Sequence, residues 1–130
     1  MGRPGRILVA EDDALSRASL AELLASEGYR VATAVDGIEA LGKLADFAPD
    51  VLLTDLWMPR LNGIDLITRA RAAVPSLEVL VMTACVQDVV DEALQQGAFG
   101  YVRKPIHFGQ LTMFIAGALE RRQTRLNARG

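Results

Sequence analysis

Five polar residues with complementary chemistry lie at the ends of four short apolar runs along the 130-residue chain. They are Glu11, Asp12, Asp55, Thr83 and Lys104. If the apolar runs are parallel strands of one sheet, these residues meet at a single edge, because the functional groups of such folds gather beyond the carboxyl ends of the strands. The sequence therefore predicts one polar site built from distant segments.

Carboxylates gathered at one point repel each other, and a cation among them relieves the repulsion. Oxygen ligands suit a hard ion such as Mg²⁺, which uses one or two carboxylates together with phosphate oxygens. Lys104 adds a compact positive charge, and the hydroxyl of Thr83 can donate to a phosphoryl oxygen. The set lacks a strong general base, so it favours phosphoryl transfer, which depends mainly on positioning and charge neutralisation. An aspartate carboxylate can serve as the covalent acceptor.

Each of these residues also has an ordinary structural interpretation. An aspartate at a strand end is most often a turn former or a helix cap. The pair Lys104-Pro105 is a loop signal, and Thr83 suits a strand as a β-branched residue. Four strand ends that each supply a different part of one site favour the functional interpretation.

The apolar runs are short and lack strict alternation, which is typical of strands buried on both faces of a parallel sheet. They lie at residues 7–10, 30–34, 51–54, 79–83 and 101–102. Helical stripes alternate with them, at residues 14–27, 38–45, 64–74, 89–94 and 111–119, the last running towards Arg122. This order predicts an α/β fold with five helices around a flavodoxin-like, doubly wound, five-stranded parallel sheet in the order 2-1-3-4-5.

Length and composition predict one globular domain over residues 1–130, with 51% hydrophobic and 23% charged residues. We expect its core at about 6–120 and a C-terminal tail or linker stub at 121–130. The net charge of -2 argues against direct nucleic-acid binding. The single cysteine excludes an intrachain disulfide. No secretory h-region or membrane-length apolar run is visible, so we expect a cytoplasmic location without a membrane segment.

Several blocks of sequence together resemble the receiver domain of bacterial two-component response regulators over roughly residues 6–120. The first two are Ile-Leu-Val-Ala-Glu-Asp-Asp at 7–13 and Leu-Leu-Thr-Asp-Leu-Trp-Met-Pro at 52–59. Asn-Gly at 62–63, Met-Thr-Ala at 82–84 and Gly-Ala-Phe-Gly-Tyr-Val-Arg-Lys-Pro at 97–105 complete the match. The order and spacing of all the blocks make the resemblance specific.

The resemblance implies that Asp55 accepts a phosphoryl group in a reaction that depends on Mg²⁺ or Mn²⁺. Asp12 and Asp55 resemble direct ligands of the ion, together with the main-chain carbonyl of Trp57, and Glu11 resembles a ligand acting through water. The family is a phospho-acceptor signalling domain, so we expect only self-catalysed phosphoryl transfer and dephosphorylation, not enzymatic turnover of a separate substrate.

Further residues match the family's switch. Lys104 resembles the lysine that pairs with the phosphoryl group, and its bond to Pro105 is expected to be cis. Thr83 and Tyr101 resemble the switch pair: the hydroxyl moves to the phosphoryl oxygen and the ring then turns inward. Phosphorylation would bias a two-state surface formed by the fourth helix, the fifth strand and the fifth helix.

Two departures from the commonest pattern lie close to this site. Trp57 is bulky and Cys85 follows Thr83 by two residues, and both positions are candidates for tuning the lifetime of the phosphoryl group. A partly exposed loop aromatic and an inert small residue are the ordinary interpretations of these two. His107, the single histidine, is interpreted as a surface residue and not as a phosphodonor.

The implied partners are a sensor histidine kinase or phosphotransfer protein, and an output domain or protein. The resemblance also allows a phosphorylation-dependent homodimer through the fourth helix, fifth strand and fifth helix. The alternative is a degenerate receiver that binds proteins independently of phosphorylation. An enzyme on a similar fold is disfavoured, since no Gly-rich loop follows the first strand and no second aspartate follows Asp55 by two residues.

Overall fold

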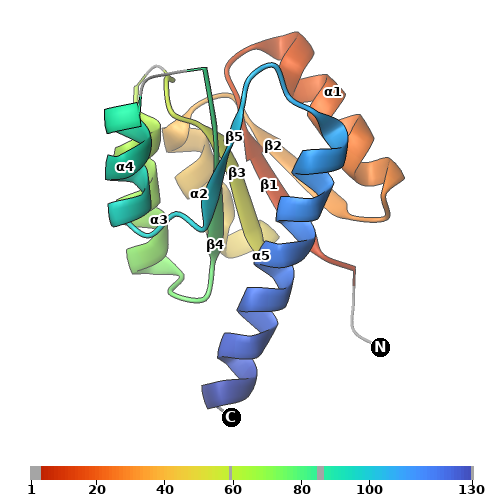
Figure 1. Ribbon diagram of the computed structural model, residues 1–130, viewed down its shortest axis with the longest axis vertical. Coiled ribbons are helices and arrows are strands. Elements are labelled where there is room, and N and C mark those ends of the chain that lie inside the picture. The colour runs from red at the N-terminus through yellow and green to blue at the C-terminus, as the bar shows by residue number, and fades with distance from the viewer. Residues whose placement is uncertain (1–3, 59, 85–86, 130) are drawn as a thin grey trace.

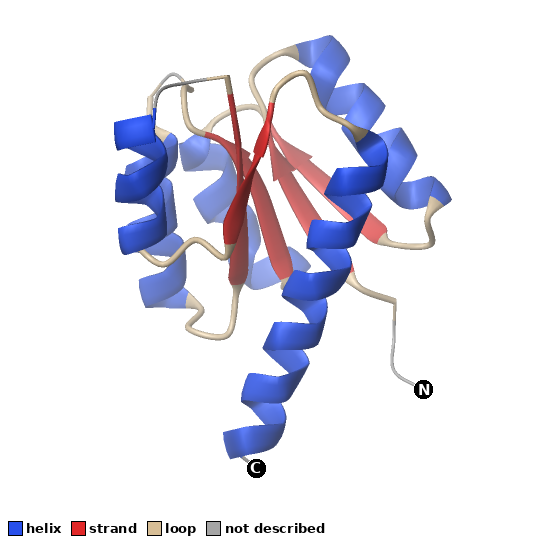
Figure 2. Cartoon of the chain, viewed as in Figure 1, coloured by secondary structure: helices blue, strands red, loops and turns tan. Residues whose placement is uncertain are grey.

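The computed structural model describes residues 4–58, 60–84 and 87–129. Its five-stranded parallel sheet has the order β2-β1-β3-β4-β5, which confirms the predicted topology (Figure 2). The strands are β1 (Arg6–Ala10), β2 (Arg30–Ala34), β3 (Val51–Asp55), β4 (Glu78–Thr83) and β5 (Gly100–Arg103). The helices are α1 (Ala14–Ser26), α2 (Gly37–Phe47), α3 (Gly63–Ala73), α4 (Gln87–Gln95) and α5 (Phe108–Arg129).

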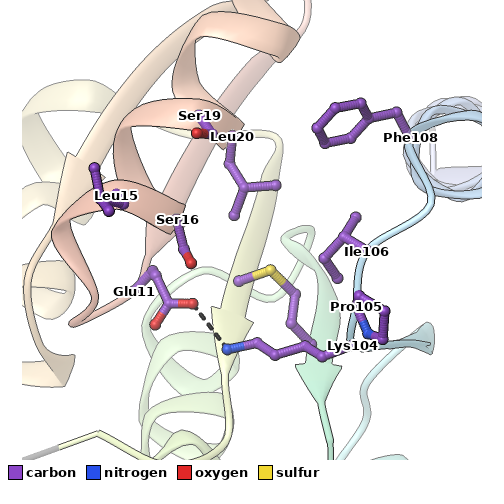
Figure 3. A pocket seen from close by; sticks show the side chains of 10 residues that line it. Glu11, Leu15, Ser16, Ser19, Leu20, Lys104, Pro105, Ile106 and Phe108 are labelled. Carbon is purple, nitrogen blue, oxygen red and sulfur yellow. Dashed lines mark hydrogen bonds and ion pairs between the residues drawn. The ribbon is translucent and has the colours of Figure 1, made fainter.

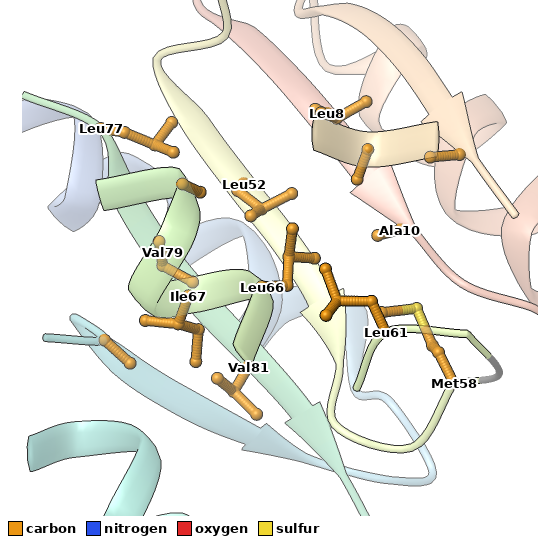
Figure 4. Packing of buried hydrophobic residues seen from close by; sticks show 14 of the residues in the cluster. Leu8, Ala10, Leu52, Met58, Leu61, Leu66, Ile67, Leu77, Val79 and Val81 are labelled. Atoms are coloured by element: carbon orange, nitrogen blue, oxygen red, sulfur yellow. The ribbon is translucent and has the colours of Figure 1, made fainter. Parts of the chain in front are cut away.

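Two hydrophobic cores lie on opposite faces of the sheet, because successive side chains of a strand point to opposite faces. On one face, Leu8 and Leu52 pack with Leu66 and Ile67 of α3 (Figure 4). On the other face, Ile7, Val9, Leu53, Leu80 and Met82 pack with Leu20 and Leu24 of α1 and with Leu111 and Ile115 of α5. Burial on both faces explains why the central strands are continuous apolar runs.

Polar caps start the first three helices close to the functional edge. Asp13, Asp36 and Asn62 each accept a hydrogen bond from the main-chain amide three residues later, at 2.8 to 3.0 Å. Such caps satisfy donors that a helix start leaves without an intrahelical partner. Asp13, one of the acidic residues after β1, is thus occupied as the cap of α1.

The last helix is longer than the sequence pattern indicates. The apolar stripe ends near Arg122, but α5 continues to Arg129 and reaches beyond the end of the sheet (Figure 1). Arg121 and Arg125 lie 3.2 and 2.6 Å from the carboxylate of Glu78 at the start of β4. Arg122 lies 3.3 Å from Asp50, just before β3. These ion pairs hold the extra turns where apolar periodicity stops.

Among the helices that the structure describes, each is too short or too polar to span a lipid bilayer.

Candidate functional site

The acidic cluster forms where the direction of chain winding reverses between β1 and β3. These strands are neighbours, and Ala10 pairs with Thr54 at their carboxyl ends. The next residues, Glu11 and Asp55, are therefore brought together. Carboxylate oxygens of Glu11, Asp12 and Asp55 all lie within 4.8 Å of one another, which suits a hard divalent cation.

Lys104 enters the same cluster from the end of β5. Its Nζ lies 2.5 Å from Oδ2 of Asp55 and 2.9 Å from Oε1 of Glu11. Figure 3 shows the side chain reaching across from the β5–α5 segment towards Glu11. The main-chain amide of Lys104 donates to the carbonyl of Thr83 at 2.9 Å, and the Lys104–Pro105 bond is cis. One ammonium thus offsets the charge of two buried carboxylates.

The orientation of Asp55 is set by its own loop. The amide of Trp57 donates to Oδ1 at 3.0 Å, while Lys104 holds Oδ2. Only 7% of Asp55 is exposed. The main chain of Gly63 closes over this turn: a Cβ at Gly63 would lie 2.6 Å from the carbonyl oxygen of Asp55. The carboxylate is therefore nearly buried, with both oxygens held by hydrogen bonds.

The loop after Asp55 packs against the hydrophobic core and against the start of α2. Met58 and Leu61 of this loop belong to the hydrophobic cluster drawn in Figure 4. Gly37 allows close packing, since a Cβ there would lie 2.6 Å from the carbonyl oxygen of Leu61. Arg60 also lies 3.2 Å from the buried carboxylate of Asp36. These contacts fix the position of the segment that carries Asp55.

Electrostatics in the cluster follow from burial and from the shared lysine. Burial raises the pKa of Glu11, with the charge of Asp55 adding to the effect and the hydrogen bond from Lys104 opposing it. Burial works to lower the pKa of Lys104, but hydrogen bonds to Asp55 and Glu11 outweigh it, and the pKa is raised. Lys104 is therefore firmly protonated and matches the negative site.

Thr83 lies on β4, which is next to β3, and Tyr101 lies on β5, the edge strand beyond it. Thr83 ends β4, is 1% exposed, and follows Met82, the register partner of Asp55. Tyr101 pairs with Val81 two residues earlier on β4. It is half-buried and lines a pocket of about 590 Å³ with Phe99 and Phe114. Thr83 thus ends its strand at the acidic edge, and Tyr101 lines a pocket shared with α5.

The remaining residues singled out in the sequence are Trp57, His107 and Cys85. Trp57 is 60% exposed beside Asp55, as expected of a loop aromatic, and His107 is exposed at the surface. Cys85 lies outside the described residues, so its expected place near Thr83 stays a prediction. A pocket of about 340 Å³ opens beside Glu11 and Lys104, bordered by Leu15 and Phe108 (Figure 3).

One contributor was not recognised from the sequence. Arg17 of α1 donates through Nη1 to the carbonyl of Glu11 at 2.9 Å and to the carbonyl of Asp12 at 3.3 Å. The available sequence clue was a cation in the first turn of a helix, where helix polarity disfavours positive charge.

The fold and the site define a doubly wound α/β domain with a carboxylate cluster, balanced by lysine, at its topological switch point. The sequence profile of the response regulator receiver domain matches residues 7–116. The chain belongs to this family, whose members are phospho-acceptor domains of two-component signalling and bind Mg²⁺ at an acidic pocket.

Individual relatives agree with this assignment. The chain is similar to response regulator MprA of Mycobacterium sp. (strain KMS), with 39% identity over 121 residues, covering 91% of this chain and 52% of that protein. MprA of Mycobacterium tuberculosis (strain ATCC 25177 / H37Ra) is 40% identical over 119 residues, covering 89% and 51%. The chain therefore spans about half the length of these curated relatives.

Solved structures show the same architecture. A response regulator receiver domain protein from Clostridium thermocellum superimposes with a TM-score of 0.87 at 29% identity, covering 92% of this chain and 98% of that one. A CheY-like receiver domain protein from Methanospirillum hungatei gives a TM-score of 0.89 at 26% identity, covering 94% and 98%.

Proposed function

We propose that Asp55 accepts a phosphoryl group from a phosphohistidine of a sensor histidine kinase or phosphotransfer protein. The observation that carries the proposal is the convergence of Asp55, Glu11 and Lys104, with Lys104 within 2.9 Å of both carboxylates. A buried, oriented carboxylate next to a fixed ammonium suits a reaction whose main requirements are positioning and charge neutralisation.

The donor set fits Mg²⁺ or Mn²⁺, because three carboxylates offer oxygen atoms within 4.8 Å of one another. Asp12, Asp55 and the main-chain carbonyl of Trp57 would hold the ion directly, and Glu11 through water. The ion supplies charge neutralisation for the phosphoryl oxygens. Asp12 is exposed and can exchange its water contacts for the ion.

The chain's own groups would carry the transfer as follows. A carboxylate oxygen of Asp55 forms the new P–O bond while the P–N bond to the donor imidazole breaks, and the imidazole leaves. The amide of Trp57 keeps the carboxylate in one orientation, since it donates to Oδ1 at 3.0 Å. Lys104 follows the negative charge from the carboxylate to the phosphoryl oxygens.

The acyl phosphate would then be read by Thr83 and Tyr101. Thr83 is buried at the end of β4, beside the acidic edge, and its hydroxyl would gain a phosphoryl oxygen as acceptor only in the phosphorylated state. Tyr101 borders the pocket formed with Phe99 and Phe114, which gives its ring space to turn inward. A contact made in one state alone shifts the population towards that state.

The surface around the site also suits contact with a phosphoryl-donating protein. We place both proteins in the cytoplasm. Leu15 and Phe108 are 81% and 48% exposed beside the pocket at Glu11 and Lys104, and offer apolar contacts near Asp55. The altered face of α4, β5 and α5 would signal to an output domain or protein, or pair with a second copy.

Incubation with acetyl phosphate and Mg²⁺, followed by intact mass, tests the function. We expect one added phosphoryl group in the wild type and in Asp46→Asn, a control at an exposed aspartate of α2. Asp55→Asn should gain none, and chelation of Mg²⁺ should prevent the gain in every protein. A wild type that stays unmodified would support the phosphorylation-independent binding module instead, and a gain that persists in Asp55→Asn would place the acceptor elsewhere.

A further inference from the structure

We propose that Arg17 is a positioning residue for the cation site, and that it acts by fixing the main chain of Glu11 and Asp12. One guanidinium nitrogen, Nη1, donates to both of their carbonyls, at 2.9 and 3.3 Å. The side chains of the same two residues supply two of the three carboxylates in the cluster. The inference deepens the proposed function, because it assigns a residue that governs how well the acidic pair holds Mg²⁺.

The placement of Arg17 argues for a specific role. It lies in the first turn of α1, whose N-terminal end carries partial positive charge and disfavours cations. Residues 14–17 hold no acidic side chain, so the helix itself does not compensate for the arginine. The compensating contacts are the two carbonyls of the β1–α1 loop, together with the nearby charge of the Asp13 carboxylate. Arg17 is half-buried, and its Nη1 carries two hydrogens, one for each of the two carbonyls.

The loop that Arg17 holds is otherwise secured by few main-chain bonds on this side. Glu11 donates its amide to the carbonyl of Ala34 at 3.1 Å. Asp13 caps α1 through the amide of Ser16 and contributes its own amide to Oε2 of Glu11 at 3.3 Å. Arg17 is the described side chain that binds the carbonyls of both acidic residues. Without Arg17, the main chain of Glu11 and Asp12 loses its side-chain hydrogen bonds to α1.

Charge and positioning predict opposite effects on metal affinity, which makes the role testable. Removal of a positive charge near the cluster strengthens the attraction of Mg²⁺ to the carboxylates. Loss of the carbonyl contacts loosens the carboxylates and weakens binding. Residues that orient metal ligands typically change affinity by about tenfold or more. We therefore expect positioning to win and Arg17→Ala to bind Mg²⁺ about tenfold more weakly.

The test is a Mg²⁺ titration followed by the fluorescence of Trp57, the single tryptophan, which lies beside Asp55. Arg17→Ala is compared with Arg69→Ala, a control that removes the same charge from an exposed position of α3. Arg17→Lys keeps the charge but replaces the rigid guanidinium with a strongly hydrated ammonium on a flexible stem, and should also bind Mg²⁺ more weakly than the wild type. Arg69→Ala should match the wild type.

Hydrogen exchange of the metal-free proteins supplies a second readout. Amides of residues 11–16 should exchange faster in Arg17→Ala, while those of the central strands β1, β3 and β4 should stay protected. Wild-type or tighter Mg²⁺ binding in Arg17→Ala, or wild-type binding in Arg17→Lys, would overturn the positioning role. A wild type that gives no Mg²⁺ response contradicts the proposed function itself, which distinguishes the two failures.

Discussion

Lys104 and Asp55 form an ion pair, with Nζ 2.5 Å from Oδ2, between segments separated by 49 residues. The same ammonium contacts the fully buried Glu11 at 2.9 Å. Two carboxylates so placed repel each other unless a positive charge lies between them. The lysine therefore serves the fold and the site at once, because it neutralises in the resting state the charges that would later hold a metal and a phosphoryl group.

Replacement of this lysine should lower stability and make the domain more dependent on Mg²⁺. We expect Lys104→Met to lose about 1–2 kcal/mol of unfolding free energy without metal, since two nearly buried carboxylates lose their cation. Added Mg²⁺ should stabilise the variant more than the wild type, because the ion replaces the missing charge. Urea denaturation with and without Mg²⁺ measures both effects.

Lys43→Met is the matched control. Lys43 lies 3.8 Å from Glu39 on α2, both side chains are 42% exposed, and its ammonium also donates to the carbonyl of Thr33. Its loss should change stability by less than about 1 kcal/mol, with no added dependence on Mg²⁺. Equal losses in the two variants would contradict the special position of Lys104.

Gly63→Ala should distort the turn that carries the acceptor. Its Cβ would lie 2.6 Å from the carbonyl oxygen of Asp55 and 2.7 Å from Cα of Leu56, both main-chain atoms that cannot move aside cheaply. We expect a loss of about 1–3 kcal/mol, typical of overpacking, and slower labelling of Asp55 by acetyl phosphate. Thermal unfolding and intact mass measure the two outcomes.

Gly42→Ala controls for the change of residue type. Gly42 lies inside α2, and a Cβ there meets no atom within 4 Å. Alanine is the better helix former by about 0.5–1 kcal/mol, so this variant should be more stable than the wild type. Stabilisation by both substitutions would show that the turn at Gly63 tolerates a Cβ.

Glu78→Gln should loosen the C-terminal turns of α5. Glu78 is fully buried and lies within 3.6 Å of nitrogens from Arg71, Arg121 and Arg125. Without the carboxylate these guanidinium groups repel one another. We therefore expect the free energy of unfolding to fall by about 2–3 kcal/mol. This is less than for a fully buried ion pair, because the arginines are partly exposed. Urea denaturation checks the loss of stability.

Trypsin adds a local measurement at the same helix. Cleavage near Arg121 and Arg125 should be faster in Glu78→Gln than in the wild type, because both arginines lose their ion pairs with residue 78 and the helix end unfolds more often. Glu22→Gln, at an exposed position of α1, should behave like the wild type. Unchanged cleavage in Glu78→Gln would show that the extra turns of α5 hold without the buried carboxylate.

Tyr29 should contribute to the alkaline limit of stability. Burial, with a smaller effect of the charge on Glu27, raises the pKa of Tyr29 above its ordinary value. Above pH ~10 the unfolded chain therefore releases this proton before the folded protein does. The unfolded state then binds fewer protons, so the unfolding free energy falls as pH rises.

The contribution of Tyr29 is thus complete below pH ~10 and is lost as the pH rises through the raised pKa of the folded state. Tyr29→Phe has no proton to release, so its stability relative to the wild type should improve between about pH 9 and 11. Urea midpoints of the two proteins across this range measure the difference. A constant difference would contradict the raised pKa.

Much of the fold was predictable because its periodicities are local. The continuous apolar runs of β1, β3 and β4 report burial on both faces, and βα alternation leaves few arrangements for a parallel sheet. The end of α5 was not predictable in this way. Arginines in its last turns pair with Glu78 and Asp50, which lie more than 40 residues earlier and carry no periodic signal.

By itself, the sequence determined which residue types stand at the strand ends, since Glu11 follows β1, Asp55 ends β3 and Lys104 follows β5. Only the tertiary structure decided their shared geometry, including the distances from the carboxylates to Lys104. It also decided that Asp13 caps α1 and that Arg17 binds the main-chain carbonyl of Glu11. The physical reason is range. Burial and helix periodicity act between neighbours in sequence, whereas hydrogen bonds and ion pairs depend on how separate elements meet in space.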